Sequence, residues 1–295
     1  MNLKRIGLFI LTNLLVITVL SVVLAILGVP SYVNEAGLNY GALLVFSAVF
    51  GFGGAFISLA MSRWMAKMAM GVRVLDASNA NGPREQWVLQ TVHGLARKAG
   101  METMPEVGIY DSEEVNAFAT GPSKKKSLVA VSTGLLDRMT QDEAEAVLAH
   151  EVAHIVNGDM VTMTLLQGVV NTFVIFLSRV IAFALSRFVD EKMAWIVHLV
   201  AVIVLQIVFG ILGSMVVMSF SRYREFHADA GSGDLVGREK MIAALERLRQ
   251  TYELVDTRQE SLATMKISGH AGIMRLLSSH PPLEERIAAL RAKAY

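Results

Sequence analysis

The sequence predicts a mainly α-helical membrane protein of the α+β class, with four transmembrane helices and one extramembrane domain that contains a small β-sheet. Two observations on composition support the membrane assignment: hydrophobic residues make up 53% of the 295 residues, and charged residues only 18%. Ordinary soluble domains carry roughly 25% charged residues. The third observation is that strand-like runs occur only between the second and third of four long apolar segments, which predicts a small sheet.

The charge balance and the lack of cysteine exclude several classes of protein. The 27 basic and 26 acidic residues leave a net charge of +1, which is too balanced for a nucleic-acid-binding protein steered by a basic field. No nucleic acid partner is therefore expected. The chain has no cysteine, so it cannot form disulfides, iron–sulfur clusters, thiolate metal sites or a cysteine nucleophile. A metal site in this chain must use His, Asp or Glu.

Four segments are long and apolar enough to cross a bilayer, because each exceeds the roughly 18–20 residues that a membrane-spanning helix needs. They are residues 6–29, 38–62, 160–186 and 193–219. The first is predicted to be a retained anchor, since its apolar stretch is longer than that of a cleaved signal peptide. Arg179 interrupts the third segment, but it can lie near the far interface and extend its side chain to water.

Charged residues around the first two segments predict the orientation of these helices. Basic residues precede the first segment and follow the second, and the loop between the two contains one acidic residue. In chain order these residues are Lys4, Arg5, Glu35, Arg63 and Lys67. Because basic residues collect on the cytoplasmic side, the N-terminus and the chain from residue 63 are predicted to be cytoplasmic. Residues 63–159 and 220–295 then form one cytosolic domain, which the third and fourth helices interrupt.

The cytosolic domain is predicted to contain three helices and three strands, from hydrophobic periodicity and from helix and turn signals. The helices are at residues 85–99, about 141–156 and 238–253, and the strands at residues 106–110, 115–120 and 128–131. The central helix has the clearest boundaries. Thr140 and Glu143 form a capping box at its start, and Asn157 followed by Gly158 is a stop signal at its end.

The central helix carries the sequence His-Glu-Val-Ala-His at residues 150–154, an HExxH motif. Its two histidines are one turn apart on the same helical face, so both rings can reach one metal ion. Glu151 is rotated by about 100° and can contact a metal-bound water without being a ligand. In a chain of this composition the motif arises by chance in roughly one case in a hundred. A pair of surface histidines is the alternative, and the helical context favours a metal site.

A catalytic zinc needs three protein ligands and an open position, and the third ligand must come from the same side of the membrane as the motif. The chain returns to that side after the fourth segment, where Glu225 and Asp229 share a helical face. Glu225 is the predicted third ligand, and Asp229 the predicted acceptor for the free ring N–H of a ligand histidine. His227 competes for the ligand position, but it lies about 200° round the helix from Glu225, so spacing favours Glu225.

Four motifs together resemble those of the HtpX family of membrane-bound zinc metalloproteases. They are NAFATG at residues 116–121, HEVAHIVNGD at 150–159, REFHADAGS at 224–232 and HPPLEER at 280–286. The resemblance extends along nearly the whole chain, and a more distant one links it to prenyl-protein endoproteases that share the HExxH…ExxxD arrangement. The resemblance implies a cytosolic, zincin-like HExxH metalloprotease domain attached to the membrane helices.

The same resemblance implies one Zn²⁺ per chain, held by His150, His154 and Glu225, with Glu151 as general base. It further implies a zinc endopeptidase of the bacterial inner membrane that degrades misfolded or damaged membrane proteins under heat-shock or envelope stress, alongside ATP-dependent membrane proteases. The expected chemistry is attack on the scissile carbonyl by a zinc-activated water, whose proton Glu151 accepts.

Two further residues and one strand complete the predicted site. His280 and Arg286 are the best candidates to donate to the tetrahedral oxyanion, although His280 could make an ordinary structural hydrogen bond and Arg286 could only buttress it. Asn116, Ala117 and Phe118 are predicted to form an edge strand that pairs with the substrate backbone. An internal strand is the alternative.

Other polar residues near these motifs are assigned structural roles or none. Asn157 and Asp159 are expected to cap a helix rather than to act in catalysis. No function is expected for His93, His198 and His270.

Only five residues separate His154 from Met160, where the third apolar segment begins. At 1.5 Å per helical residue the zinc should lie within roughly 10–15 Å of the membrane surface, so cytosolic loops and tails of membrane proteins are the expected substrates. Three other functions are less consistent with the sequence. Cleavage inside the bilayer conflicts with the charged motif helix, a structural zinc would need His227 or His280 as fourth ligand, and four short-looped spans make a poor transporter.

Overall fold

The computed structural model describes residues 16–29, 31–34, 37–258 and 276–292. Contacts within the chain divide it into two units. The first comprises Met1–Ser58 and Met163–Val217, and the second Leu59–Thr162 and Met218–Tyr295. Some sequence predictions concern residues outside the described part: residues 6–15 of the first transmembrane segment, the charged residues Lys4, Arg5 and Glu35, and His270.

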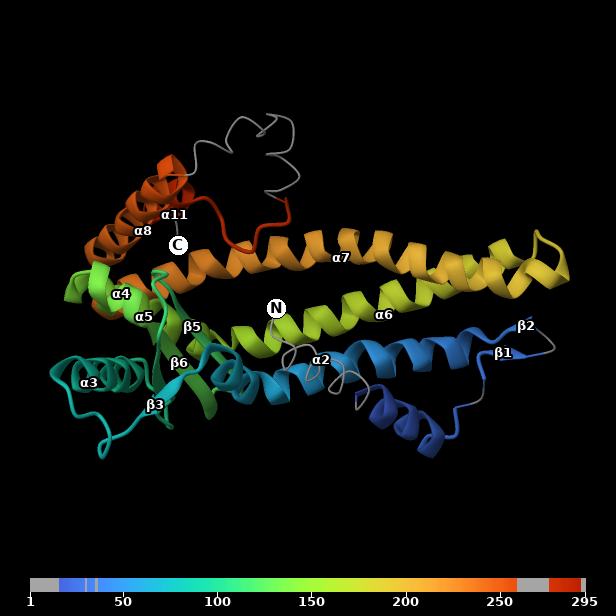
Figure 1. Cartoon of the computed structure of the whole chain (residues 1–295), viewed down its shortest axis with the longest axis horizontal. Helices are drawn as coiled ribbons and strands as arrows, with labels where there is room; N and C mark the ends of the chain where they lie inside the picture. Colours follow the sequence, from blue (N-terminus) through green and yellow to red (C-terminus); the bar gives the residue numbers. More distant parts are fainter. Residues whose placement is uncertain (1–15, 30, 35–36, 259–275, 293–295) are drawn as a thin grey trace. The chain divides into compact units, whose positions relative to one another are not determined.

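Long apolar helices make up most of the first unit (Figure 1). Among the described residues three helices are long and apolar enough to cross a membrane: α2 (Tyr40–Met70), α6 (Asp159–Ser186) and α7 (Glu191–Val236). A shorter apolar helix, Val16–Ile26, lies within the predicted first segment. Many apolar side chains of the long helices are exposed, as expected where lipid tails rather than water surround them.

The first unit also contains two features that the sequence analysis did not predict. Strands β1 (Val33–Asn34) and β2 (Gly37–Leu38) pair antiparallel just before α2. The guanidinium of Arg179, inside α6, lies 5.0 Å from the centre of the Phe46 ring, and its Nη1 donates to the carbonyl of Ile175 at 3.3 Å. Because a cation is attracted to an aromatic face, these contacts offset part of the cost of a charge in an apolar helix.

A four-stranded mixed sheet forms part of the second unit, with the strands in the order β3-β4-β6-β5. They are β3 (Arg73–Leu75), β4 (Glu106–Tyr110), β5 (Ala117–Ser123) and β6 (Lys126–Ser132). Strands β4 and β6 run parallel, and the other two pairs are antiparallel. Among the described strands β5 pairs only with β6, so β5 lies at one edge of the sheet.

The helices of the second unit confirm the predicted fold class, which is mainly helical with a small sheet. Among its described residues they are α3 (Pro83–Lys98), α4 (Thr133–Arg138), α5 (Gln141–Asn157), α8 (Arg238–Arg258) and α11 (Leu283–Ala292), besides parts of α2, α6 and α7. The sequence analysis predicted α3, α5 and α8 with ends shifted by a few residues. It did not predict the short helices α4 and α11.

Helix α5 begins and ends where its capping residues dictate. The hydroxyl of Thr140 accepts from the backbone N–H of Glu143 at 3.3 Å, and the Glu143 carboxylate accepts from the N–H of Thr140 at 2.8 Å. At the other end Gly158 adopts a left-handed φ of 74°, a conformation that strains residues with a side chain but not glycine. The chain therefore turns sharply after Asn157, and α6 starts at Asp159.

The main hydrophobic core of the second unit forms around α5. This helix packs against α3, β5, β6 and α8, and its side chains Leu148, Val152 and Ile155 are fully buried. Burying an apolar side chain of this size stabilises the fold by about 1.5–3 kcal/mol. Because His150 and His154 lie on the same helix, the core also fixes their positions.

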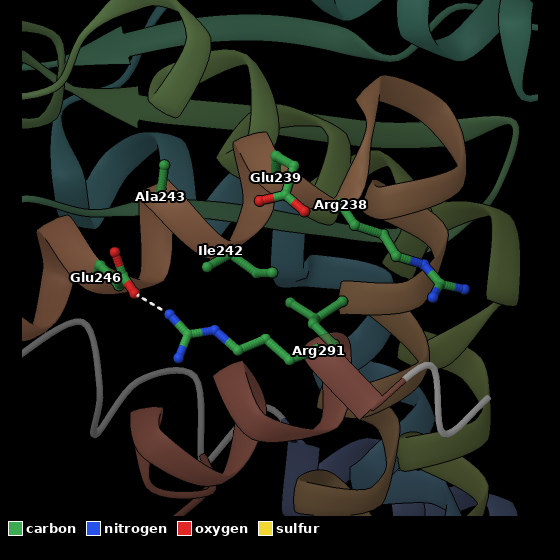
Figure 2. Close-up of a pocket in the computed structure, with 7 residues that line it drawn as sticks. Arg238, Glu239, Ile242, Ala243, Glu246 and Arg291 are labelled. Atoms are coloured by element: carbon green, nitrogen blue, oxygen red, sulfur yellow. Dashed lines mark hydrogen bonds and ion pairs between the residues drawn. The ribbon is translucent and has the colours of Figure 1, made fainter.

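Helices α8 and α11 leave a cavity of about 390 Å³ between them (Figure 2). Ile242 and Leu290 line it, and Arg291 Nη2 pairs with Glu246 Oε1 at 2.6 Å from one helix to the other. No predicted site residue lines this cavity. The ion pair nevertheless bears on the site, because it helps to hold α11, the helix that carries Arg286.

Candidate metal centre

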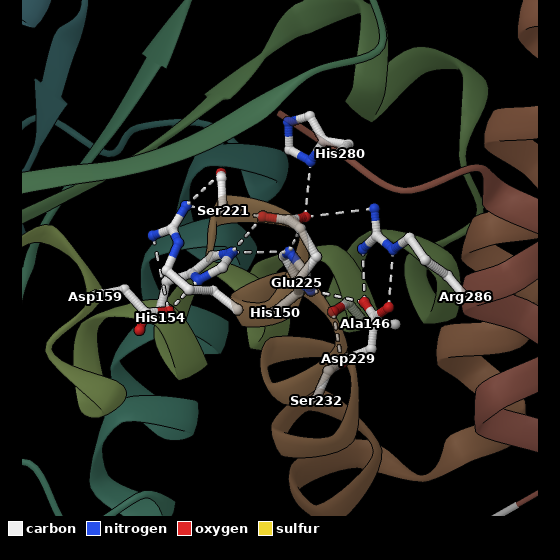
Figure 3. A network of polar contacts seen from close by, with 11 residues as sticks. Ala146, His150, His154, Asp159, Ser221, Glu225, Asp229, Ser232, His280 and Arg286 are labelled. Carbon is white, nitrogen blue, oxygen red and sulfur yellow. Dashed lines mark hydrogen bonds and ion pairs between the residues drawn. The ribbon is translucent and has the colours of Figure 1, made fainter. Parts of the chain in front are cut away.

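Three side chains from two helices converge on one point in the second unit (Figure 3). His150 and His154 come from α5 and Glu225 from α7, and all three are buried. The Nε2 atoms of the two histidines are 3.1 Å apart. Glu225 Oε1 lies 3.4 Å from Nε2 of His154, and Oε2 lies 3.5 Å from Nε2 of His150. The structure thus brings together the three ligands that the sequence analysis predicted.

The spacing of these atoms fits a tetrahedral zinc site. Zinc–ligand bonds of about 2.0–2.1 Å separate the ligand atoms of a tetrahedron by about 3.3 Å, which matches the three separations. Each histidine turns its Nδ1 towards an aspartate oxygen, so the two Nε2 atoms face each other and Glu225. Two imidazoles with one carboxylate are a donor set that zinc prefers.

The electrostatic surroundings of His150 and Glu225 favour a positive charge at this point. Burial opposes the protonation of His150, but its hydrogen bonds with Asp229 and Glu225 outweigh this effect and raise its pKa to about 9. Burial also disfavours the charge on Glu225, yet hydrogen bonds from His150, His154 and His280 hold the pKa of this carboxyl far below its usual range. Glu225 is therefore ionised, as a metal ligand must be.

Each of the two histidines lies against a different aspartate. Nδ1 of His150 lies 2.9 Å from Asp229 Oδ1, and Nδ1 of His154 is hydrogen-bonded to Asp159 Oδ2 at 2.6 Å. The sequence analysis predicted the role of Asp229 from its position one turn after Glu225. It assigned Asp159 to a helix cap and did not predict the contact with His154. The sequence feature that points to this contact is Gly158, because the sharp turn at this glycine directs Asp159 back towards His154.

Arg286 from α11 binds Asp229 with two hydrogen bonds. Its Nε donates to Oδ2 at 2.8 Å and its Nη2 to Oδ1 at 2.6 Å, and Nη1 lies 3.5 Å from Glu225 Oε2. Burial would raise the pKa of Asp229, but the bonds from Arg286 and His150 lower it. The structure therefore places Arg286 against Asp229, with two of its nitrogens engaged there, rather than against His280.

The other two candidate histidines, His227 and His280, differ in their distance from the ligands. His280 is exposed, and its Nδ1 lies 2.7 Å from Glu225 Oε2. The segment before it is anchored by Arg222, whose Nη1 donates to the carbonyls of Leu276 and Ser278. Nδ1 of His227 lies 3.1 Å from the carbonyl of Tyr223. His227 is absent from the described residues that could hold the metal, as its place on the helix predicted.

The predicted substrate strand lies close to the motif helix. Asn116 precedes β5, and its carbonyl accepts from the N–H of Ser132 at 2.9 Å. Ala117 and Phe118 belong to β5 and are paired with β6 on one side only. Since α5 packs against β5, the open edge of this strand belongs to the same part of the second unit as the histidines.

A close approach of α7 to α5 brings Glu225 to the histidines. Ser232 Oγ donates to the carbonyl of Ala146 at 2.8 Å. A Cβ atom at Gly231 would lie only 2.8 Å from Cβ of Ala153, which is too close for two carbon atoms. Glycine at position 231 therefore permits the approach, because any other residue would force the helices apart.

The substitution Gly231→Ala is expected to separate α7 from α5 and so to move Glu225 away from the histidines. Overpacking of this kind costs about 1–3 kcal/mol, so both the thermal stability and the affinity for zinc should fall. Gly94→Ala on α3 is the matched control, because no heavy atom lies within 4 Å of the added Cβ. Unchanged zinc affinity in the Gly231→Ala protein would show that this close approach does not position Glu225.

Comparisons with known proteins agree with this geometry. A model of peptidase family M48 matches residues 83–294. A protein named Protease HtpX homolog from Bacillus licheniformis is 58% identical over 296 residues, which span 98% of this chain and 99% of that protein. Protease HtpX from Thioalkalivibrio sulfidiphilus is 56% identical over 295 residues, with the same coverage. The crystal structure of Ste24p from S. mikatae has a TM-score of 0.65 at 19% identity and covers 97% of this chain and 64% of that chain.

These findings confirm the resemblance that the motifs suggested. The family match covers most of the second unit, and the identities to the HtpX proteins extend over nearly the whole chain. The long apolar helices agree with a membrane protein, and the group His150, His154 and Glu225 agrees with a divalent metal. The chain therefore belongs to the HtpX membrane metalloproteases of peptidase family M48.

Proposed function

We propose that this metalloprotease is a zinc-dependent endopeptidase of the bacterial inner membrane, with one Zn²⁺ per chain, that hydrolyses misfolded or damaged membrane proteins at the cytoplasmic surface. The convergence of His150, His154 and Glu225 carries the proposal, because the three atoms are spaced as tetrahedral zinc requires. Among the described residues this group has no fourth member, which leaves a position for water or substrate.

Glu151 is the proposed general base. When bound, zinc polarises the scissile carbonyl and lowers the pKa of water. Glu151 follows His150 on α5, is partly exposed and is not one of the three ligands. Its carboxylate can therefore accept the proton of the attacking water and return it to the leaving nitrogen.

His280 and Arg286 both lie near Glu225 Oε2, and different roles are proposed for them. His280 is exposed and close to the ligand carboxylate, so it can turn a ring N–H towards the oxyanion that forms on the substrate. Arg286 is buried and bound to Asp229, which supports a role in holding the residue that orients His150.

The edge strand that begins with Asn116, Ala117 and Phe118 is proposed to bind the substrate backbone. A strand added to an open sheet edge is held by main-chain hydrogen bonds, which do not depend on the substrate sequence. Such binding needs an extended chain, so unfolded segments are the expected substrates. This selectivity agrees with a protease that removes misfolded proteins. ATP-dependent membrane proteases, with which it is proposed to cooperate, would act on substrates that are still folded.

The membrane location and orientation follow from sequence features. We propose four spans, of which the first includes the helix Val16–Ile26, with the N-terminus and the protease unit in the cytoplasm. The short distance along the chain from His154 to Met160 favours cleavage near the membrane surface.

Proteolysis by the purified protein in detergent tests the proposed function. The metal is first removed with a chelator, and then one equivalent of zinc is added back. Two substrates are compared: an unfolded soluble protein, and a membrane-anchored protein with an unfolded cytosolic tail. Both are expected to be cut only after zinc is restored, and the second near its anchor. If a fully zinc-loaded protein cut neither substrate, the site would be structural and the proposal would fail.

A further inference from the structure

The carboxylate of Asp159 faces Nδ1 of His154, as the carboxylate of Asp229 faces Nδ1 of His150. Both contacts join an aspartate oxygen to Nδ1, at 2.6 and 2.9 Å, and all four side chains are buried. A histidine that binds a metal through Nε2 usually donates its other N–H to a carboxylate, which fixes the tautomer and the orientation of the ring. The two halves of the site are thus built alike, although the aspartates come from different helices.

Each aspartate is accompanied by an arginine. Arg286 is hydrogen-bonded to Asp229, whereas Arg224 lies further from Asp159, with 3.9 Å between Nη1 and Oδ2. Arg224 Nη2 also lies 4.0 Å from Glu225 Oε1, opposite the side on which Arg286 approaches Oε2. Glu225 is therefore placed between two arginines, each near the aspartate that holds one of the ligand histidines.

These charges are matched to a divalent cation. Four carboxylates gather at the site: Glu151, Asp159, Glu225 and Asp229. The two arginines offset two of these negative charges, and a Zn²⁺ ion would offset the other two. Loss of Asp159 would disturb this balance and would also leave the Nδ1 proton of His154 without its buried acceptor.

We propose that Asp159 is a positioning residue, which orients His154 for metal binding, and that Arg224 offsets its charge. The inference rests on the proposed function, since it concerns the same metal site. Asp159 is the first residue of α6, so the alternative role is that its charge merely stabilises the start of that helix. The closing experiment separates these two roles.

Zinc affinity, measured by competition with a chelator and without substrate, is the first readout. Asp159→Ala is expected to weaken zinc binding by about 10- to 100-fold. Asp159→Asn keeps an oxygen that can accept from Nδ1, so it should restore most of the affinity. Glu239→Ala is the matched control, because Glu239 is an exposed acidic residue in the first turn of α8. It should bind zinc like the wild type.

The visible absorption spectrum of the Co²⁺-substituted protein is the second readout, since it reports the geometry of the ligands. Asp159→Ala should shift this spectrum, and Asp159→Asn and Glu239→Ala should leave it near that of the wild type. An unchanged affinity and spectrum in Asp159→Ala, or an equal loss of affinity in Glu239→Ala, would overturn the inference. A wild type that binds zinc but cuts no substrate would refute the proposed function alone.

Discussion

Replacement of Glu151 by Gln is expected to reduce proteolysis by a factor of about 10²–10⁴ or more while leaving the metal bound. Gln has the size and shape of Glu, but its amide cannot accept a proton from water at neutral pH. Because His150, His154 and Glu225 are the proposed ligands, the substitution is expected to remove no ligand. The measurement is the rate of degradation of an unfolded protein by the Glu151→Gln and wild-type enzymes at equal zinc content.

A glutamate elsewhere in the second unit provides the control for this change. Glu239→Gln removes a charge from the first turn of α8, where the side chain is exposed, and should retain full activity. Substantial cleavage by the zinc-loaded Glu151→Gln protein would refute the assignment of the general base. Loss of zinc in that protein would instead mean that Glu151 contributes to metal binding.

The substitution Glu225→Gln is expected to have an equally large effect, through the metal rather than through the chemistry. Glu225 is 1% exposed, and its oxygens lie 3.5 and 3.4 Å from Nε2 of His150 and His154 and 2.7 Å from Nδ1 of His280. A neutral amide is a poor zinc ligand and leaves Arg286 and Arg224 facing an uncharged group. Loss of a neighbouring carboxylate costs about 10- to 100-fold in metal affinity, so loss of this ligand should cost more than 100-fold.

Zinc competition with a chelator measures this loss, and proteolysis should disappear with it. His227→Gln is the control, because His227 lies two residues away on the same helix but is not among the described residues that could hold the metal. It is expected to bind zinc normally. If Glu225→Gln kept its zinc while His227→Gln lost it, the third ligand would be His227 and the assignment would be reversed.

Local signals in the sequence predicted the elements that such signals control. The capping box at Thr140 and the glycine at 158 gave the bounds of α5 almost to the residue. Strand β3 was missed because three residues are too few to show alternation, and its position depends on pairing with β4. Helices α4 and α11 are likewise short. They are supported by contacts with residues distant in the sequence, such as Arg84 for α4 and helix α8 for α11.

The convergence of the two histidines was predictable because helical spacing alone places His150 beside His154. The same spacing turns His227 away from Glu225. The contact between Asp159 and His154 was not predictable from periodicity, because it crosses the break between α5 and α6. The partner of Arg286 depends on how α11 packs in three dimensions, so the sequence indicated its neighbourhood but not the atoms it would bind.

The order of the metal ligands along the chain has a consequence for biosynthesis. His150 and His154 are translated before α6, whereas Glu225 follows the apolar stretch of α7. A nascent or truncated chain that ends before α7 is complete has two of the three ligands and cannot close the site. Synthesis of α6 and of the apolar stretch of α7 therefore precedes assembly of the metal site, so a chain that ends earlier is not expected to cleave proteins.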